Sequence, residues 1–119
     1  MRALLLALLL GGCASAPDPR AQYASGLLYV EGDSMRPGIE GGSVRFLNRD
    51  VPFEEVRIGD LIAWWSRRLH RLIVHRVVDV RRSGDGRRYV ITKGDANPAP
   101  DAERTTVADY VGIVVPNLP

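Results

Sequence analysis

Six short runs of β-branched and aromatic residues organise the chain after residue 26. The runs cover residues 27–32, 43–47, 60–65, 72–80, 87–93 and 110–115, and Gly, Pro, Asn and Asp cluster between them. Such runs are typical of strands, and the turn Ser83-Gly84-Asp85-Gly86 is typical of a tight hairpin. No segment of ten or more residues has a helical period, although residues 51–56 suit a short helical turn. The pattern predicts an all-β fold, a small twisted or partly closed β-barrel.

Three residue types that a serine hydrolase needs occur in order between and within these runs. Ser34 lies in EGDSMRPG, His75 in the run IVHRV, and Asp95 and Asp101 in TKGDANPAPD. Serine must pass its proton to a base, imidazole titrates close enough to neutrality to accept it, and a carboxylate orients the ring. Ser34 is placed where a strand breaks into a turn, which predicts an exposed hydroxyl.

The choice of base is narrow. Strand alternation places His75 on one face with Ile73, Val77 and Asp79, which suits the edge of a cleft. Lys93 is the only lysine among 16 basic residues. It falls in the KGD turn rather than on the strand where a catalytic lysine would be expected, which disfavours a Ser-Lys dyad. His70, the other histidine, lies in the arginine-rich stretch SRRLHR, which predicts a solvated hairpin tip.

The motifs around these residues resemble those of the type I signal peptidases. The segments that match in order and spacing are EGDSMRPG, RIGDLIAWW, IVHRV, KGDANPAPD and DYVGIVVPNLP. Together they cover about residues 27 to 119, and they are most similar to the archaeal and endoplasmic-reticulum branch, in which histidine replaces lysine as the base. Gly32 and Asp33 before the serine also resemble the related LexA-type self-cleaving repressors. Signal peptidases often have a hydroxyl residue at the position of Gly32, so only backbone N–H groups remain here as oxyanion donors.

The resemblance implies peptide cleavage by a Ser-His-Asp mechanism. Ser34 would be the nucleophile and His75 the base, and the N–H groups of Ser34 and Met35 would bind the oxyanion. The substrate would be an extended peptide with small residues before the cut, lying beside the strand that leads into Ser34. Leu28, Val30 and Met35 are the candidate substrate contacts.

Two aspartates compete to orient His75. Asp95 lies in a tight turn, where its carboxylate can be used in capping backbone N–H groups. Asp101 follows Pro98-Ala99-Pro100, a stiff extended segment that can carry a carboxylate back over the sheet. The resemblance also places the partner of the histidine six residues after the KGD aspartate, which is Asp101.

The N-terminus predicts export. Met1 and Arg2 precede eight apolar residues, which is the length of a signal-peptide core and far short of the roughly 20 residues of a membrane span. Leu10-Gly11-Gly12-Cys13 resembles a bacterial lipobox, and Pro17 disfavours ordinary cleavage after Ala16. We therefore expect a signal peptide at 1–12, a lipidated Cys13 with a tether to residue 26, and a catalytic domain at 27–119. The product would be a bacterial membrane lipoprotein facing the periplasm or the cell exterior, held in the membrane by its lipid anchor.

Composition limits the other functional classes. Cys13 is the only cysteine, so no internal disulfide can form, and no His/Cys cluster predicts a metal site. The net charge is only +2 and no nucleic-acid motif accompanies the arginines. We therefore expect no metal, no cofactor and no nucleic-acid partner. Two alternatives to a signal-peptidase-like enzyme remain open: a LexA-like domain that cleaves itself or a partner, and a non-catalytic binding lipoprotein with the same fold.

Overall fold

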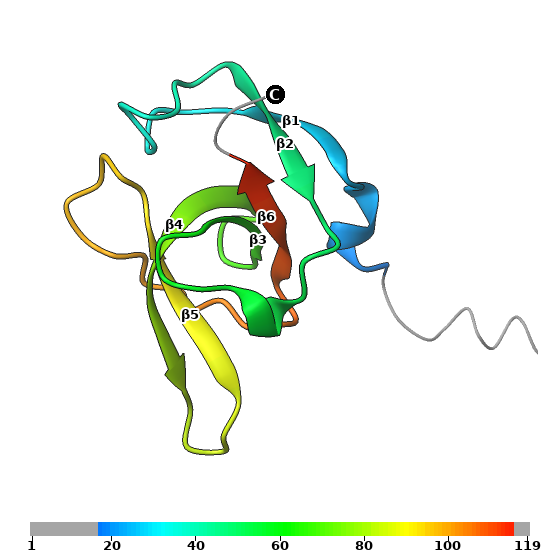
Figure 1. Ribbon diagram of the computed structural model, residues 1–119, viewed down its shortest axis with the longest axis vertical. Coiled ribbons are helices and arrows are strands. Elements are labelled where there is room, and N and C mark those ends of the chain that lie inside the picture. The colour runs from blue at the N-terminus through cyan, green and yellow to red at the C-terminus, as the bar shows by residue number, and fades with distance from the viewer. Residues whose placement is uncertain (1–16, 116–119) are drawn as a thin grey trace, which may run out of the picture.

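A single antiparallel sheet of six strands forms the body of the protein. The computed structural model describes residues 17–115, and the strands are β1 (Gly26–Val30), β2 (Ser43–Asn48), β3 (Leu61–Ser66), β4 (Arg71–Arg82), β5 (Arg88–Lys93) and β6 (Tyr110–Val115). Their order in the sheet is β1-β2-β6-β3-β4-β5, so β6 is inserted between two strands that are consecutive in the sequence. The sheet is strongly curved but not closed, because β1 and β5 remain its edges (Figure 1).

The predicted strands and turns are present. Each of the six runs forms a strand, and the short helical turn is the 3-10 helix η2 (Phe53–Glu55). The hairpin turn between β4 and β5 is closed by the N–H of Gly86, which donates to the carbonyl of Ser83. The fold class inferred from the hydrophobic pattern is therefore confirmed.

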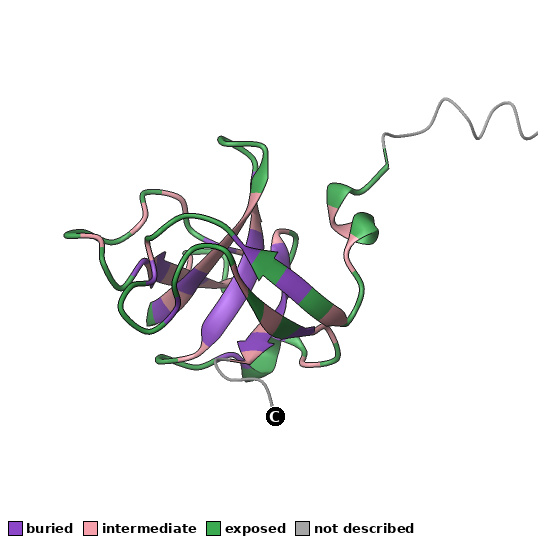
Figure 2. Ribbon diagram, turned by 90° about the horizontal axis from the view of Figure 1, so that it is seen from above, coloured by how far each residue is buried: buried purple, intermediate pink, exposed green. Residues whose placement is uncertain are grey.

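Two apolar clusters pack on opposite faces of the central strand β3. Leu61 and Ala63 of this strand face the first cluster, whereas Ile62 and Trp64 face the second. The residues of the first cluster are Leu28, Val30, Met35, Ile39, Leu47, Leu61, Ala63, Val111 and Val114. Those of the second are Phe53, Val56, Ile62, Trp64, Val77, Val90 and Tyr110. Burial is accordingly concentrated in the central strands, while the surrounding loops are exposed (Figure 2).

Part of the predicted tether is attached to the domain. Pro19–Gln22 forms the 3-10 helix η1, capped by the Asp18 carboxylate, and Tyr23 packs against the first cluster. The guanidinium of Arg20 donates to the carbonyls of Val107 and Tyr110, and that of Arg49 donates to those of Arg20 and Tyr23. The segment from Pro19 to Tyr23 is thus held against the sheet by the hydrogen bonds of two arginines.

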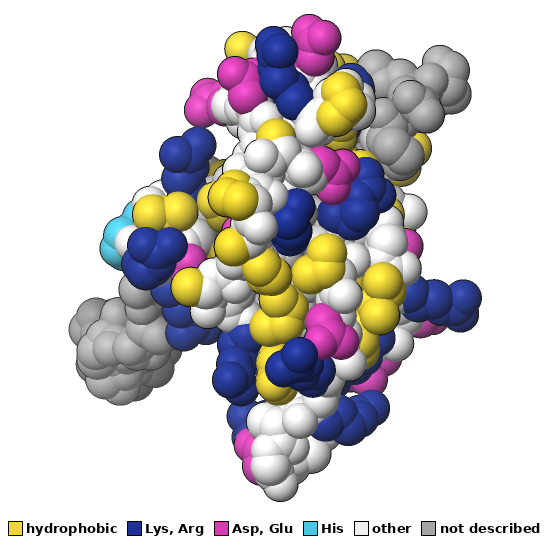
Figure 3. Space-filling model, turned by 90° about the vertical axis from the view of Figure 1, so that its left-hand side faces the viewer, with side chains coloured by type: hydrophobic (Ala, Val, Ile, Leu, Met, Phe, Trp, Pro, Cys, Tyr) yellow, Lys and Arg dark blue, Asp and Glu magenta, His cyan; other side chains and the backbone are white. Residues whose placement is uncertain are grey.

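The arginine-rich hairpins carry many internal ion pairs. Arginines pair with acidic side chains at Arg67–Asp109, Arg68–Glu103, Arg76–Asp95, Arg81–Asp79, Arg82–Glu54 and Arg87–Asp85. On the face that Figure 3 shows, basic and acidic side chains are interspersed around a broken band of apolar ones. Exposed pairs of this kind are screened by solvent, so they balance charge more than they stabilise the fold.

Candidate active site

Ser34 lies in the loop that leaves β1, as predicted. The loop is folded by two backbone hydrogen bonds, from the N–H of Arg36 to the carbonyl of Asp33 and from the N–H of Ile39 to the carbonyl of Met35. The Met35 side chain is 2% exposed and belongs to the first apolar cluster, where it anchors the loop from beneath. Ser34 itself is half-buried at the surface above it.

His75 lies on β4 next to the point where the pairing of β4 with β5 ends. On one side β4 pairs with β3, with His75 opposite Ile62. On the other side the pairing with β5 ends at Arg76 and Lys93, so the chain that follows β5 turns away next to His75. The loops after β1 and after β5 meet on this side of the molecule (Figure 1). The imidazole is nearly buried, and its Nε2 is 3.0 Å from the Oγ of Ser34.

Asp101 is the carboxylate that contacts His75. Its Oδ2 is 2.6 Å from Nδ1 of the imidazole, and both side chains are largely shielded from solvent. The same oxygen accepts a hydrogen bond of 2.6 Å from the hydroxyl of Thr92, and the backbone N–H of Asp101 donates to the Thr92 carbonyl at 2.8 Å. Ser34, His75 and Asp101 therefore form a continuous hydrogen-bonded chain.

Asp95 is held elsewhere. Its two carboxylate oxygens accept hydrogen bonds from Nε and Nη2 of Arg76 at 3.0 and 2.9 Å, and it makes none to His75. The hydrogen bond from Arg76 lowers the pKa of Asp95 below its ordinary value. The backbone of this turn does reach the serine loop, since the N–H of Ala96 donates to the Ser34 carbonyl at 2.8 Å and that of Asp95 points to Sδ of Met35 at 3.4 Å. The Asp95 side chain thus pairs with Arg76 outside the hydrogen-bonded chain, while the backbone of its turn contacts the serine loop.

Position 94, at the centre of the site, has room only for a glycine. A Cβ atom there would lie 2.8 Å from the carbonyl oxygen of Ser34 and 3.0 Å from Nε2 of His75. Both distances are shorter than ordinary van der Waals separations. Any side chain at position 94 would therefore push the Ser34 loop away from His75. Gly94 and Thr92 were not among the residues predicted from the sequence. The signal for both was their place directly beside Lys93, where the last residues of a strand meet the matched KGD turn.

The other candidates for the base stay apart from Ser34. Nζ of Lys93 donates to the carbonyl of Gly94, within its own turn. His70 is exposed at the tip between β3 and β4, as predicted. Met35 requires a correction as a candidate substrate contact, because its side chain is buried in the core and cannot line an open cleft. Its backbone N–H and that of Ser34 donate no hydrogen bond within residues 17–115, which leaves both pointing to no protein acceptor there.

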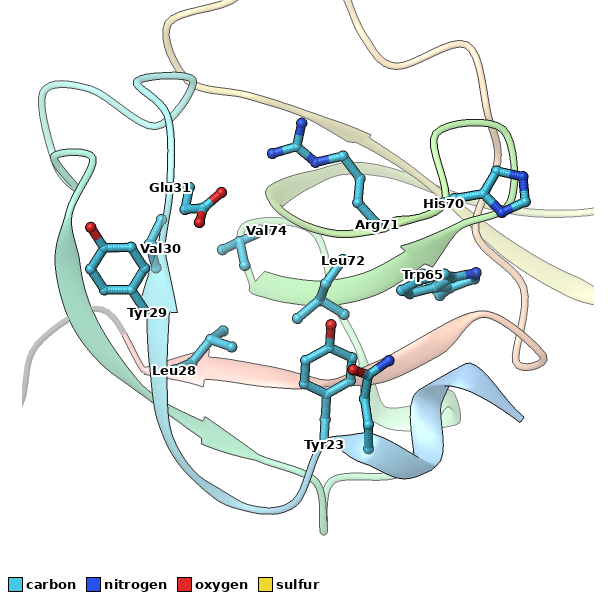
Figure 4. A pocket seen from close by; sticks show the side chains of 11 residues that line it. Tyr23, Leu28, Tyr29, Val30, Glu31, Trp65, His70, Arg71, Leu72 and Val74 are labelled. Carbon is cyan, nitrogen blue, oxygen red and sulfur yellow. The ribbon is translucent and has the colours of Figure 1, made fainter. Parts of the chain in front are cut away.

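A cleft runs between β1 and β4. It has a volume of about 390 Å³. Leu28 and Val30 of β1 form one wall, and Leu72 and Val74 of β4 form the opposite one (Figure 4). Val74 and His75 are consecutive on β4, so their side chains point to opposite faces of the strand, and His75 and Asp101 line a smaller hollow with Trp64 and Ile73. Glu31 and Arg71 project from the two sides, and Trp65, His70 and Tyr23 line the far part.

The predicted signal peptide and Cys13 lie outside the described residues. Among residues 17–115, no helix has both the length and the apolar character that crossing a membrane requires. The lipidation of Cys13 therefore stays a prediction from the sequence.

Comparison with known proteins gives one consistent group of relatives. The chain is 38% identical over 77 residues to the signal peptidase complex catalytic subunit SEC11 of Eremothecium gossypii, covering 65% of this chain and 45% of that protein. It is 30% identical over 104 residues to SEC11 of Debaryomyces hansenii, with 80% and 60% covered, and 34% identical over 107 residues to SEC11 of Leptosphaeria maculans, with 81% and 59% covered. The chain thus spans about half the length of these curated relatives. No protein-family model matches it, nor does any solved structure.

Proposed function

Because the chain belongs to the signal peptidase family and is similar to its SEC11 catalytic subunits, we propose that it is a serine endopeptidase that cleaves exported peptides. One observation carries the proposal. Ser34, His75 and Asp101 are connected at 3.0 and 2.6 Å in the order that a nucleophile, a base and an orienting carboxylate require.

The geometry supports a two-step acyl transfer. Nε2 of His75 takes the proton of the Ser34 hydroxyl while Oγ attacks the scissile carbonyl, and the resulting imidazolium gives that proton to the leaving amine. Water then attacks the acyl-enzyme by the same route and releases the second product. Asp101 accepts the Nδ1 proton in a hydrogen bond throughout, which keeps Nε2 unprotonated in the resting enzyme and stabilises the imidazolium.

The backbone of the serine loop would stabilise the oxyanion. The N–H groups of Ser34 and Met35 have no acceptor within the described residues, and the Met35 side chain fixes the loop from below. A preorganised donor at such a position contributes roughly 3 kcal/mol to transition-state stabilisation. The proposal needs no side-chain donor, which agrees with Gly32 standing two residues before the serine.

The substrate would bind as an added strand. β1 pairs only with β2, so its other edge has backbone groups free to pair with a peptide. A strand laid along this edge would direct alternate side chains between Leu28 and Val30 on one wall and Leu72 and Val74 on the other. The apolar side chains on the two walls favour uncharged side chains ahead of the cut.

A peptide-cleavage assay tests the proposal. The parent should cleave an exported-protein peptide with small residues before the cut, and its acyl-enzyme should be detectable by mass after rapid quenching. Ser34→Ala should do neither and should stay folded, because the change removes only the hydroxyl that contacts Nε2 of His75 and no core contact. Ser83→Ala, in the β4–β5 turn, is the matched control and should cleave the peptide and form the acyl-enzyme as the parent does. Equal cleavage by Ser34→Ala and the parent would reject the proposal.

We further propose that the enzyme is an exported bacterial lipoprotein, anchored through Cys13. The support is the lipobox-like sequence and the single cysteine. The domain would then face the periplasm or the cell exterior, where exported peptides are found. Labelling cells with a fatty acid should mark the parent and not Cys13→Ser. A soluble, unlabelled parent that begins at Pro17 would show that the leader is an ordinary secretory signal.

A further inference from the structure

A buried hydroxyl lies behind the triad. Thr92, on β5, is fully buried, and its hydroxyl donates to Oδ2 of Asp101 at 2.6 Å. This is the same oxygen that receives Nδ1 of His75 at 2.6 Å. A threonine hydroxyl has one proton, and the buried Thr92 hydroxyl donates it in a hydrogen bond to a largely shielded carboxylate.

The β-sheet register places this hydroxyl. Thr92 pairs with Val77 across β4 and β5, and partners in a sheet point to the same face. Val77 and His75 are two residues apart on β4, so their side chains point to the same face of the sheet. The Thr92 side chain therefore lies on the same face as His75. The Thr92 carbonyl also accepts the backbone N–H of Asp101. One residue therefore fixes Asp101 both at its backbone and at its carboxylate.

We propose that Thr92 is a positioning residue of the triad, which holds the Asp101 carboxylate against His75 and tempers its attraction for the imidazole proton. This inference rests on the proposed function, because such a residue affects catalysis only if the three side chains act together. Two donors share the charge of Oδ2. Removal of the Thr92 donor leaves a stronger acceptor for His75, so the imidazole keeps its proton to a higher pH. The carboxylate also gains rotational freedom, which weakens the alignment of the ring.

Three variants separate this role from a structural one. Thr92→Val keeps the shape and removes the donor, and Thr92→Ser keeps the donor and removes a methyl group. Thr105→Val is the matched control. Thr105 is equally buried and follows Asp101 in the same loop, but its hydroxyl has no partner within the described residues.

The pH profile of cleavage is the main measurement. Thr92→Val should have a kcat about tenfold lower with an unchanged KM, as expected for loss of a hydrogen bond to a charged group. The midpoint of the acid limb should move upward by about half a pH unit. Thr92→Ser should restore both values to near the parental ones, and Thr105→Val should leave both unchanged. A folded Thr92→Val with parental kcat and acid limb would overturn the proposal.

A second measurement needs no substrate. In the uncomplexed enzyme the Nδ1 proton of His75 should give a low-field NMR signal, assigned in a His70→Gln background. Its titration should move upward in Thr92→Val and stay in place in Thr105→Val. If the parent cleaves no peptide, the proposed function is wrong. The titration still tests whether the Thr92 hydroxyl acts on His75 through Asp101. An unmoved titration in Thr92→Val would overturn the positioning role, and if that variant does not fold, Thr92→Ala in the same measurement decides.

Discussion

Replacement of Gly94 by alanine should disable the site through distance alone. The new Cβ would lie 2.8 Å from the Ser34 carbonyl oxygen and 3.0 Å from Nε2 of His75. It would also lie 2.6 Å from Nδ2 of Asn97, but that side chain can turn away. The carbonyl belongs to the backbone, so relief there must come from movement of the serine loop or of the turn after β5.

The expected loss of activity in Gly94→Ala can be estimated from how far the new contacts fall below a normal van der Waals distance. Carbon contacts are relaxed at about 3.5 Å or more, so the serine loop must move away from Gly94 by about 0.7 Å. Misplacement of reacting groups by about 1 Å costs on the order of a hundredfold in rate. We therefore expect kcat/KM to fall between tenfold and a hundredfold, and the fold to lose about 1 to 3 kcal/mol from overpacking.

The assay compares Gly94→Ala with Gly84→Ala. Gly84 lies in the β4–β5 turn, where an added Cβ meets nothing within 4 Å. Both variants add one methyl group to a turn glycine, but only one is beside the triad. Peptide cleavage and the rate of labelling by a serine-directed reagent should fall in Gly94→Ala and remain parental in Gly84→Ala. Full activity of Gly94→Ala at the parental melting temperature would refute the reasoning.

Further substitutions test the charged and buried groups. Asp101→Asn should lower kcat by orders of magnitude with little change in melting temperature, whereas Asp95→Asn should stay active and lose about 1 kcal/mol in thermal unfolding; the reverse pattern would transfer the orienting role to Asp95. Because Arg76 lowers the pKa of Asp95 below 3.8, this carboxylate stabilises the fold above that pH and loses its effect on further acidification. Acid titration should therefore destabilise the parent more steeply than Asp95→Asn, and equal slopes would contradict this. Burial raises the pKa of Tyr110 to about 12, so the parent should lose stability between about pH 10 and 12 as the unfolded chain releases a proton that the folded chain holds. Tyr110→Phe should lack this loss and should cost about 1 kcal/mol at neutral pH, since the Tyr110 hydroxyl donates to the Val51 carbonyl; an unchanged alkaline slope would speak against it.

The strands were predictable because each has a local signature. Alternation and turn residues defined the six strands, and the turn chemistry of Ser83 to Gly86 located the long hairpin. The order β1-β2-β6-β3-β4-β5 was not predictable in the same way. The insertion of β6 between β2 and β3 depends on which apolar faces pack together, and this is decided by contacts far apart in the chain.

The site was predictable to the level of residue types in matched motifs. The pairing of His75 with Asp101 followed from the stiff segment after the turn and from the resemblance. Met35 was misplaced as a substrate contact because hydrophobic character does not distinguish a cleft wall from a core anchor. The contact between Thr92 and Asp101 depends on the register of β4 and β5, which single-residue patterns do not encode.

The topology separates Ser34 from its two partners. Ser34 follows β1, and the β1–β2 hairpin joins the remaining sheet through three residue pairs between β2 and β6, whereas β3 and β4 are joined through six. His75 and Asp101 belong to this better paired part. Local opening of the first hairpin would thus withdraw the nucleophile and the side chains that this hairpin gives to the first apolar cluster, while the second cluster, on the other face of β3, stays packed. Peptide cleavage should then be lost at a lower temperature than the one at which the whole domain melts. The loss should reverse on cooling.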